Sequence, residues 1–352
     1  MLPKEVLERA QDELLNYKGT GMSVMELPVK APEVEEIMLS CEKNCRELLE
    51  IPSNYKVLFL QGGATSQYAA IPINLLSEHK CADYIVSGQS ARDAYLEAKK
   101  FGDVVIAASS GGSGPVYNTI PATSKANFRP DADYVYMCYT NSVCGTKFNY
   151  IPDTGNIPLV ADMTGFLFSE PIDVSKFGLI FASARANFGI AGLTVVIVRD
   201  DLIGRVAPST PTMLNYKLLS DNRSMYNTPP IFSIYMMNLM LEWMISVGGL
   251  VEIKRGNERK ASVLYDFFDN SRYYTTPVDN KCRSMMAVRF FTGDQEYDEK
   301  FIEGAEKAGL INLRADKNIG GMCASIYNSM PIEGVNKLLE YMKEFEQDNP
   351  KL

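Results

Sequence analysis

The apolar positions of the first fifty residues recur at helical spacing. Val6, Ala10 and Leu14 follow a proline at position 3, so this pattern predicts an amphipathic helix that ends near Gly19. A second helix is predicted from about Pro32 to Leu49. Both segments carry polar residues between the apolar ones, which is typical of helices that lie on the surface of a core.

Beyond residue 55 the pattern changes to short apolar runs bounded by turn residues, with segments between them long enough for helices. This alternation predicts an α/β fold with a mainly parallel, seven-stranded sheet. The expected strands are Lys56 to Leu60, Asp83 to Ser87, Asp103 to Ala108, Tyr134 to Tyr139, Leu159 to Met163, Leu179 to Ser183 and Thr194 to Arg199.

After about Gly248 the chain shows two long amphipathic helical patterns, near 250–268 and 333–346, around weaker strands at 284–291 and 324–327. This pattern of helical and strand segments predicts a smaller α+β domain. We therefore expect an N-terminal helix at 1–14 that packs with the small domain, a large domain at 15–248 and a small domain at 249–352.

The net charge of −8, with acidic and basic residues interspersed, argues against a general affinity for nucleic acid or anionic membrane. No apolar run approaches the roughly 20 residues that span a bilayer. The N-terminal residues lack the charged and then apolar start of a secretory signal, so a cytoplasmic location is expected.

The seven cysteines form no CxxC pair, so they indicate neither a disulfide framework nor a zinc ribbon, and no metal site is expected. Cys41 and Cys45 are expected in the core. The one histidine, His79, lies in a polar turn, which argues against a mechanism with a histidine base. Ser109 to Gly114 is glycine-rich, but it lacks the spacing of known phosphate loops and is expected to be a flexible loop.

Two other features have the form of a binding site. Gln61-Gly62-Gly63-Ala64-Thr65 follows a predicted strand and precedes a helix, where backbone N–H groups and the helix N-terminus favour an anion. Asp162 ends a predicted buried strand, where open α/β sheets place their ligands. There it would either hold a pyridinium nitrogen, which makes the ring an electron sink, or cap a helix or turn.

Several segments in order along the chain closely resemble the phosphoserine aminotransferase family, a class V branch of the pyridoxal phosphate (PLP)-dependent aspartate-aminotransferase fold. They include Asn16 to Glu26, Tyr55 to Gln67, Leu159 to Ile180, Tyr226 to Pro230 and Ala324 to Pro331. The resemblance covers nearly the whole chain. It implies a homodimer with active sites at the interface, and the exchange of an amino group between phosphoserine and 2-oxoglutarate in serine biosynthesis.

The resemblance also implies roles for single residues. Ala64 and Thr65 fall on the turn that holds the PLP phosphate, Ser142 on a threonine near the ring and Asp162 on the partner of the pyridinium nitrogen. Asn227 and Thr228 match a pair that reaches the cofactor phosphate of the neighbouring subunit. Part of a PLP or pyridoxamine phosphate (PMP) site is therefore expected, with noncovalent binding.

The departures from the family pattern concentrate at the reacting centre. Ala186, in the run Phe181 to Gly189, stands where the family has the lysine that forms a Schiff base with PLP. Arg185 replaces the glutamine before that lysine, and Ser90 replaces a tryptophan that stacks on the ring. At the substrate-anion positions, Val29-Lys30 stands for a His-Arg pair, Asp316-Lys317 for another and Cys323 for an arginine.

Alanine can neither bind PLP covalently nor move a proton, and general acid-base catalysis alone contributes about 100- to 10,000-fold. The sequence therefore predicts a transaminase homologue that is impaired or inactive, without a catalytic residue at position 186. Lys176 belongs to a turn one strand upstream and Lys30 is the more open replacement. The alternatives are a non-catalytic partner of an active paralogue, a lysine-free PMP enzyme and an engineered Lys→Ala variant; the several joint changes favour natural divergence.

Overall fold

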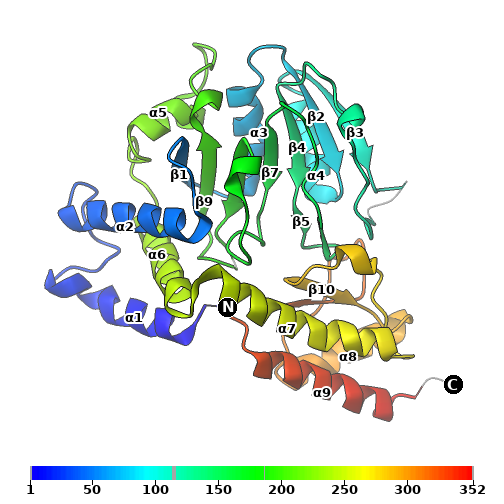
Figure 1. The fold of residues 1–352 in the computed structure, drawn as a ribbon. Helices are drawn as coiled ribbons and strands as arrows, with labels where there is room; N and C mark the ends of the chain where they lie inside the picture. Colours follow the sequence, from blue (N-terminus) through cyan, green and yellow to red (C-terminus); the bar gives the residue numbers. More distant parts are fainter. Residues whose placement is uncertain (1, 113–115, 186, 351–352) are drawn as a thin grey trace.

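The computed structural model describes residues 2–112, 116–185 and 187–350. At its centre lies a seven-stranded sheet with the order β1-β9-β8-β7-β4-β2-β3 (Figure 1). Its strands are β1 Tyr55–Gln61, β2 Cys81–Val86, β3 Asp103–Ser109, β4 Tyr134–Cys138, β7 Leu159–Asp162, β8 Leu179–Ser183 and β9 Leu193–Arg199. The predicted α/β sheet is confirmed, and the predicted strands differ from these only by a few terminal residues.

Strand β9 is antiparallel to both of its neighbours, β1 and β8, while the remaining neighbours in the sheet pair in parallel. Strand β1 therefore runs in the same direction as β8, β7, β4, β2 and β3. Consequently the carboxyl ends of these strands gather along one edge of the sheet, the place where open α/β sheets bind ligands.

Helices cover the sheet and build the C-terminal part of the molecule. They are α1 Lys4–Leu15, α2 Pro32–Leu49, α3 Ala64–Leu75, α4 Gln89–Ala98, α5 Tyr216–Asp221, α6 Ile231–Ser246, α7 Gly249–Asn270, α8 Gln295–Lys307 and α9 Ile332–Asp348. The short strands pair as β5 Thr140–Asn141 with β6 Thr146–Lys147, and β10 Ala287–Phe290 with β11 Met322–Ser325. Of the helices in the described part of the chain, none alone is long and apolar enough to cross a membrane; α6 and α7 pass that test only as a pair bent by 85°.

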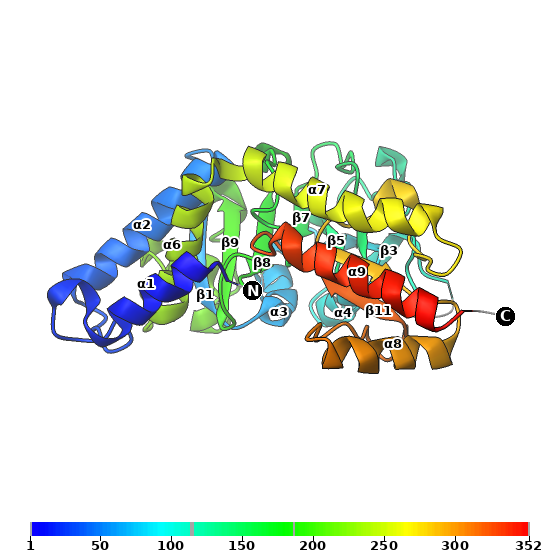
Figure 2. The ribbon, with the colours of Figure 1, turned by 90° about the horizontal axis from the view of Figure 1, so that it is seen from below.

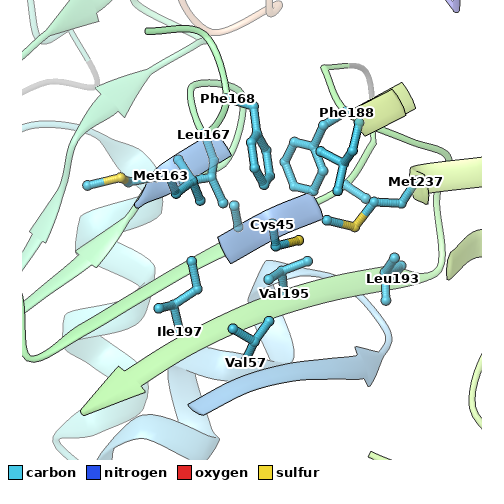
Figure 3. Close-up of a cluster of buried hydrophobic side chains, with 14 of the residues drawn as sticks. Cys45, Val57, Met163, Leu167, Phe168, Phe188, Leu193, Val195, Ile197 and Met237 are labelled. Atoms are coloured by element: carbon cyan, nitrogen blue, oxygen red, sulfur yellow. The ribbon is translucent and has the colours of Figure 1, made fainter. Parts of the chain in front are cut away.

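The two faces of the sheet carry separate hydrophobic clusters, as the alternation along β9 shows. Val195 and Ile197 pack with residues of α2 and α6, including Cys45 and Met237 (Figure 3). Val196 and Val198 point to the opposite face, where α3, α4 and α5 cover the sheet. Burial of these side chains from water, at about 25 cal/mol per Å², is the main force that holds the layers together.

A third hydrophobic cluster lies entirely within residues 261–345 and joins the second half of α7 to α8, α9 and the β10–β11 pair. The first half of α7 belongs elsewhere, since Leu250 and Ile253 pack into the cluster of the large sheet. Figure 1 shows α7 running from below the sheet to the C-terminal helices. The predicted division at residues 248 and 249 falls between α6 and α7.

The N-terminal helix packs mainly against α6, within residues 15–248, whereas the sequence suggested packing with the small domain. Val6 and Ala10 belong to the same cluster as α6. Polar contacts reinforce this position, because Arg9 pairs with Glu242 at 2.5 Å and Tyr235 donates a hydrogen bond to Glu13 at 2.5 Å. Figures 1 and 2 both show α1 near α2 and α6. An apolar stripe predicts that a helix packs, but it does not specify the partner.

Candidate active site

Asp162 lies at the carboxyl end of β7, in the middle of the sheet, and its side chain is only 2% exposed. Its Oδ1 accepts a hydrogen bond from the backbone N–H of Thr164 at 2.9 Å. Burial raises the pKa of Asp162 to about 6, and the hydrogen bonds from Thr164 oppose that rise. A buried carboxyl that lacks a cationic partner among the described residues is suited to a protonated ring nitrogen.

The surroundings of Asp162 include Tyr68 on α3 and Ser90 on α4. Burial raises the pKa of Tyr68, the charge of Asp162 adds to this, and a hydrogen bond with Ser90 opposes it. The Tyr68 ring also packs edge-on against Phe181 of β8, with the ring centroids 6.5 Å apart. Ser90, which was predicted to border the ring, is therefore close to Asp162 through Tyr68, a residue that the sequence analysis did not identify.

The phosphate-type turn joins β1 to α3. Gly62 adopts a positive φ of 100°, a conformation that glycine tolerates, and its N–H donates to Gly192 O at 3.1 Å. Gly63 is the N-cap of α3 and offers no side-chain acceptor, so N–H groups of the first turn are left for water or an anion. Ala64 and Thr65 form the start of α3, half-buried and exposed respectively.

Asn227 and Thr228 lie beside this turn in the same chain. The side-chain amide of Gln61 donates to Thr228 O at 2.5 Å. The two residues also line a cavity of about 210 Å³ together with Gln61, Ser66 and Gln67. Their side chains are exposed, so they are available for a further contact, which the resemblance assigns to a second subunit.

A second group of predicted residues meets between the sheet and the C-terminal part. Cys323 of β11 lies with its Sγ 4.0 Å from Ser142 O, in the loop after β5. Tyr327 hydrogen-bonds Ser142, and the charge of Arg185 lies near enough to oppose the rise that burial causes in the pKa of Tyr327. Gly165 is needed here, because a β-carbon on it would lie 2.9 Å from Ser142 Oγ.

The remaining predicted positions are more scattered. Ala186 lies outside the described residues. Asp316 and Lys317 are exposed on the loop before β11, and Lys317 lines a cavity with Arg289. Lys30 is exposed on the turn before α2. Lys176 ends a short helical turn before β8, at the opposite end of that strand from the Asp162 edge, which agrees with its predicted position.

Four residues near these positions were not predicted from the sequence: Tyr68, Tyr327, Asn141 and Arg289. Asn141 Nδ2 donates to Ser87 O at 3.2 Å, and its Oδ1 accepts from the N–H groups of Val143 and Cys144, so it holds the loop that carries Ser142. Arg289 did give a signal, since it is a charged residue inside the apolar run 286–291. In the described parts of the chain, no group of three His, Cys, Asp or Glu side chains could hold a metal ion.

These residues fit a noncovalently bound PLP or PMP. Asp162 is a buried acid without a cationic partner among the described residues, and the α3 N-terminus can take a phosphate. Position 186, where the resemblance places the Schiff-base lysine, is alanine. The described residues thus provide the two polar ends of a cofactor cradle.

Comparison with known proteins agrees with this geometry. Residues 1–338 match the family described as "Aminotransferase class-V". The phosphoserine aminotransferase of Bacillus cereus is 46% identical over 349 residues, which cover 99% of this chain and 96% of that protein. That of Pseudomonas paraeruginosa is 46% identical over 347 residues, with the same coverage.

Solved structures give the same result. Phosphoserine aminotransferase from Bacillus circulans subsp. alkalophilus superposes with a TM-score of 0.95 at 40% identity, covering 99% of this chain and 96% of that one. The PLP-bound enzyme from Trichomonas vaginalis gives a TM-score of 0.92 at 34% identity, covering 97% of each chain. The chain therefore belongs to the class V aminotransferase family and is a homologue of the phosphoserine aminotransferases within it.

Proposed function

We propose that this chain is a phosphoserine aminotransferase homologue in which transamination is impaired and in which PLP or PMP binds without a covalent bond. The observation that carries the proposal is alanine at position 186, in a chain that is otherwise homologous to the enzymes over its full length. Family membership supports an inherited fold, whereas the catalytic activity depends on the residues at the site.

In the proposed site, Asp162 would hold the pyridinium nitrogen, and Thr65 with the first turn of α3 would hold the phosphate. When bound, the cofactor supplies an electron sink that stabilises negative charge at a substrate carbon. Proton transfer at that carbon requires a base, and three side chains near Asp162 and Ser142 are unsuited to it. Burial raises the pKa of Tyr68, of Tyr327 and of the Cys323 thiol, the last to about 11, so they stay protonated near pH 7.

A second candidate function is that of a non-catalytic subunit, either in a homodimer or beside an active paralogue. It is favoured by the exposed Asn227 and Thr228, which retain the family residue types although the lysine is gone. In such a dimer this chain would supply Asn227 and Thr228 to the phosphate end of its partner's site. The oligomeric state and the partner are part of this proposal.

The experiment titrates the purified chain with PLP and with PMP, alongside the variants Ala186→Lys and Arg185→Gln/Ala186→Lys. Binding is followed by absorbance, and a covalent bond is detected by borohydride reduction and mass spectrometry. We expect noncovalent binding to the unmodified chain and covalent labelling at position 186 in the variants. Phosphoserine transamination should be at least about 100-fold faster in the double variant than in the unmodified chain.

Two outcomes would change the proposal. If neither the unmodified chain nor the variants bind PLP or PMP, the site has lost its cofactor and the role as a non-catalytic subunit is supported. If the unmodified chain transaminates phosphoserine at the rate of its bacterial homologues, the proposed impairment is refuted. Mass measurement of the unmodified chain under native conditions reports its oligomeric state in the same preparations.

A further inference from the structure

Arg289 is a buried cation that has no counter-ion among the described residues. Its residue is 4% exposed, and its Nη2 donates to Ile319 O at 2.6 Å and to Gly320 O at 3.4 Å. Its Nε and Nη1 find no hydrogen-bond partner among the described residues. Together these two nitrogens carry three N–H donors. A buried charge that lacks an opposite charge and acceptors is unfavourable, so a cation in this position is suited to an incoming anion.

Neighbouring arginines in the C-terminal part behave differently. Arg283 pairs with Asp269 at 2.6 Å, and Arg314 pairs with Glu299 at 2.6 Å. Both pairs lie nearer to water, with half-exposed or exposed partners. The lack of a carboxylate at Arg289 is therefore a property of that position and not of arginines in this part of the chain.

The strand pairing directs Arg289 toward the large domain. Val288 and Phe290, on either side of it, pack into the C-terminal cluster, so the Arg289 side chain leaves β10 on the opposite face. A β-carbon on Gly145, in the loop after β5, would lie 3.3 Å from Arg289 Cβ. Directly opposite in the antiparallel register is Cys323, whose Sγ lies 4.0 Å from Ser142 O.

Arg289 also lines a cavity of about 650 Å³ with Lys317 and Ile319. The acidic side chains of this cavity already have partners. Glu299 pairs with Arg314, Asp298 accepts from Thr292 N at 2.7 Å, and Asp294 caps α8. They therefore leave the charge of Arg289 uncompensated.

We propose that Arg289 binds the carboxylate group of a small organic acid between the β10–β11 pair and the loop 142–145. A carboxylate is a monoanion that matches the single charge of the guanidinium, and its oxygens accept N–H hydrogen bonds. Arg289 on β10 and Cys323 on β11 are directly opposite and lie on the same face of the strand pair, so a guanidinium at either position would reach the same space.

In the described conformation Nε and Nη1 are covered, so the acid enters when the loop 315–321 moves. Gly320 and Gly321 at the end of this loop both have positive φ angles, of 65° and 73°. Successive glycines allow the loop to change its backbone conformation at low cost. This inference goes beyond the proposed function, because it requires neither a cofactor nor a residue at position 186.

The test measures binding of succinate, and separately of inorganic phosphate, to the cofactor-free full chain by calorimetry and by the ligand-induced change in Tm. The variants are Arg289→Met and, as the matched control on the same cavity, Arg314→Met. We expect succinate affinity to fall at least about 10-fold in Arg289→Met and to stay within about 3-fold in Arg314→Met. Without ligand, Arg289→Met should have a Tm equal to or above that of the unmodified chain, since it removes an unpaired buried charge.

A third variant, Arg289→Cys/Cys323→Arg, moves the guanidinium across the strand pair. Recovery of succinate binding in this variant, relative to Arg289→Met, supports an anion site shared by the two strands. The proposal is overturned if the unmodified chain binds no succinate at 10 mM, if it prefers phosphate, or if Arg289→Met binds succinate as well as the unmodified chain. A lower Tm of Arg289→Met without any change in binding assigns Arg289 a structural role and also overturns it. Since no PLP is present, these results are independent of the cofactor titration.

Discussion

The backbone N–H of Asn328 donates a hydrogen bond to Asn187 Oδ1 at 3.2 Å. The link is buried, and it is extended on both sides. Asn187 Nδ2 donates to Leu167 O at 2.9 Å, and Asn257 of α7 donates to Asn328 Oδ1 at 2.8 Å. The residue after position 186 is thereby tied both to the large sheet and to the C-terminal part.

The first prediction concerns this network. Asn187→Ala should lower the free energy of unfolding by about 1–3 kcal/mol, because it leaves a buried N–H and a buried carbonyl without partners. A fall in Tm measured by circular dichroism checks this. In the Ala186→Lys background the same change should also reduce covalent labelling by PLP. Asn222→Ala, at the exposed end of α5, is the control and should leave both quantities nearly unchanged.

The second prediction concerns Asp162 and pH. Its pKa rises from 3.8 unfolded to about 6 folded, so the folded chain holds the proton more tightly. The contribution of Asp162 to the free energy of unfolding is therefore fully present below about pH 4. It is lost as the pH rises through 6, and the total loss is about 3 kcal/mol. Without cofactor, Asp162→Asn should be more stable than the unmodified chain at pH 7.5, and this advantage should disappear near pH 4. If the Tm difference between Asp162→Asn and the unmodified chain is the same at both pH values, the raised pKa of Asp162 is contradicted.

The third prediction concerns Lys260, which is 4% exposed and donates from Nζ to Tyr327 O at 2.6 Å. Burial lowers the pKa of Lys260 from 10.5 to about 8. Between these values the unfolded chain holds more protons, so this group makes the chain more stable as the pH rises from 8 to 10.5. The Tm difference between the unmodified chain and Lys260→Met should shift in favour of the unmodified chain over that range. Lys254→Met, whose side chain on α7 is 44% exposed, is the matched control variant.

The fourth prediction concerns the contact between Gly88 and Asn141. A β-carbon on Gly88 would lie 2.3 Å from Asn141 Nδ2, which is closer than atoms can approach. Gly88→Ala should therefore displace Asn141 from Ser87 O, disturb the loop with Ser142, and cost about 1–3 kcal/mol of stability. PLP affinity should fall as well. Gly256→Ala, in α7 with open space around it, should be neutral or stabilising by up to about 1 kcal/mol. If Gly88→Ala binds PLP as tightly as the unmodified chain, the loop with Ser142 does not contribute to the cofactor site.

The sheet was predictable because its strands are continuous apolar runs, such as 179–183, which was predicted with both ends correct. The helix Pro32–Leu49 was also correct, since a proline starts it and its apolar spacing is regular. The packing of α1 against α6 was not predicted, because an amphipathic pattern does not identify its partner. Tyr68 and Tyr327 could not be recognised, since their importance arises from contacts with Ser90 and Ser142 across distant parts of the chain.

The position of helix α7 has a consequence for how this protein unfolds. Because Leu250 and Ile253 pack with the large sheet while Leu264 and Phe268 pack with the C-terminal strands, one rigid helix is shared between two cores. Loosening either core withdraws apolar contacts from the other, so we expect heating to melt both parts in one cooperative step. If the chain is cut between residues 248 and 249, the part that ends at residue 248 loses Leu250 and Ile253. Its core then exposes apolar surface, which should lower its solubility.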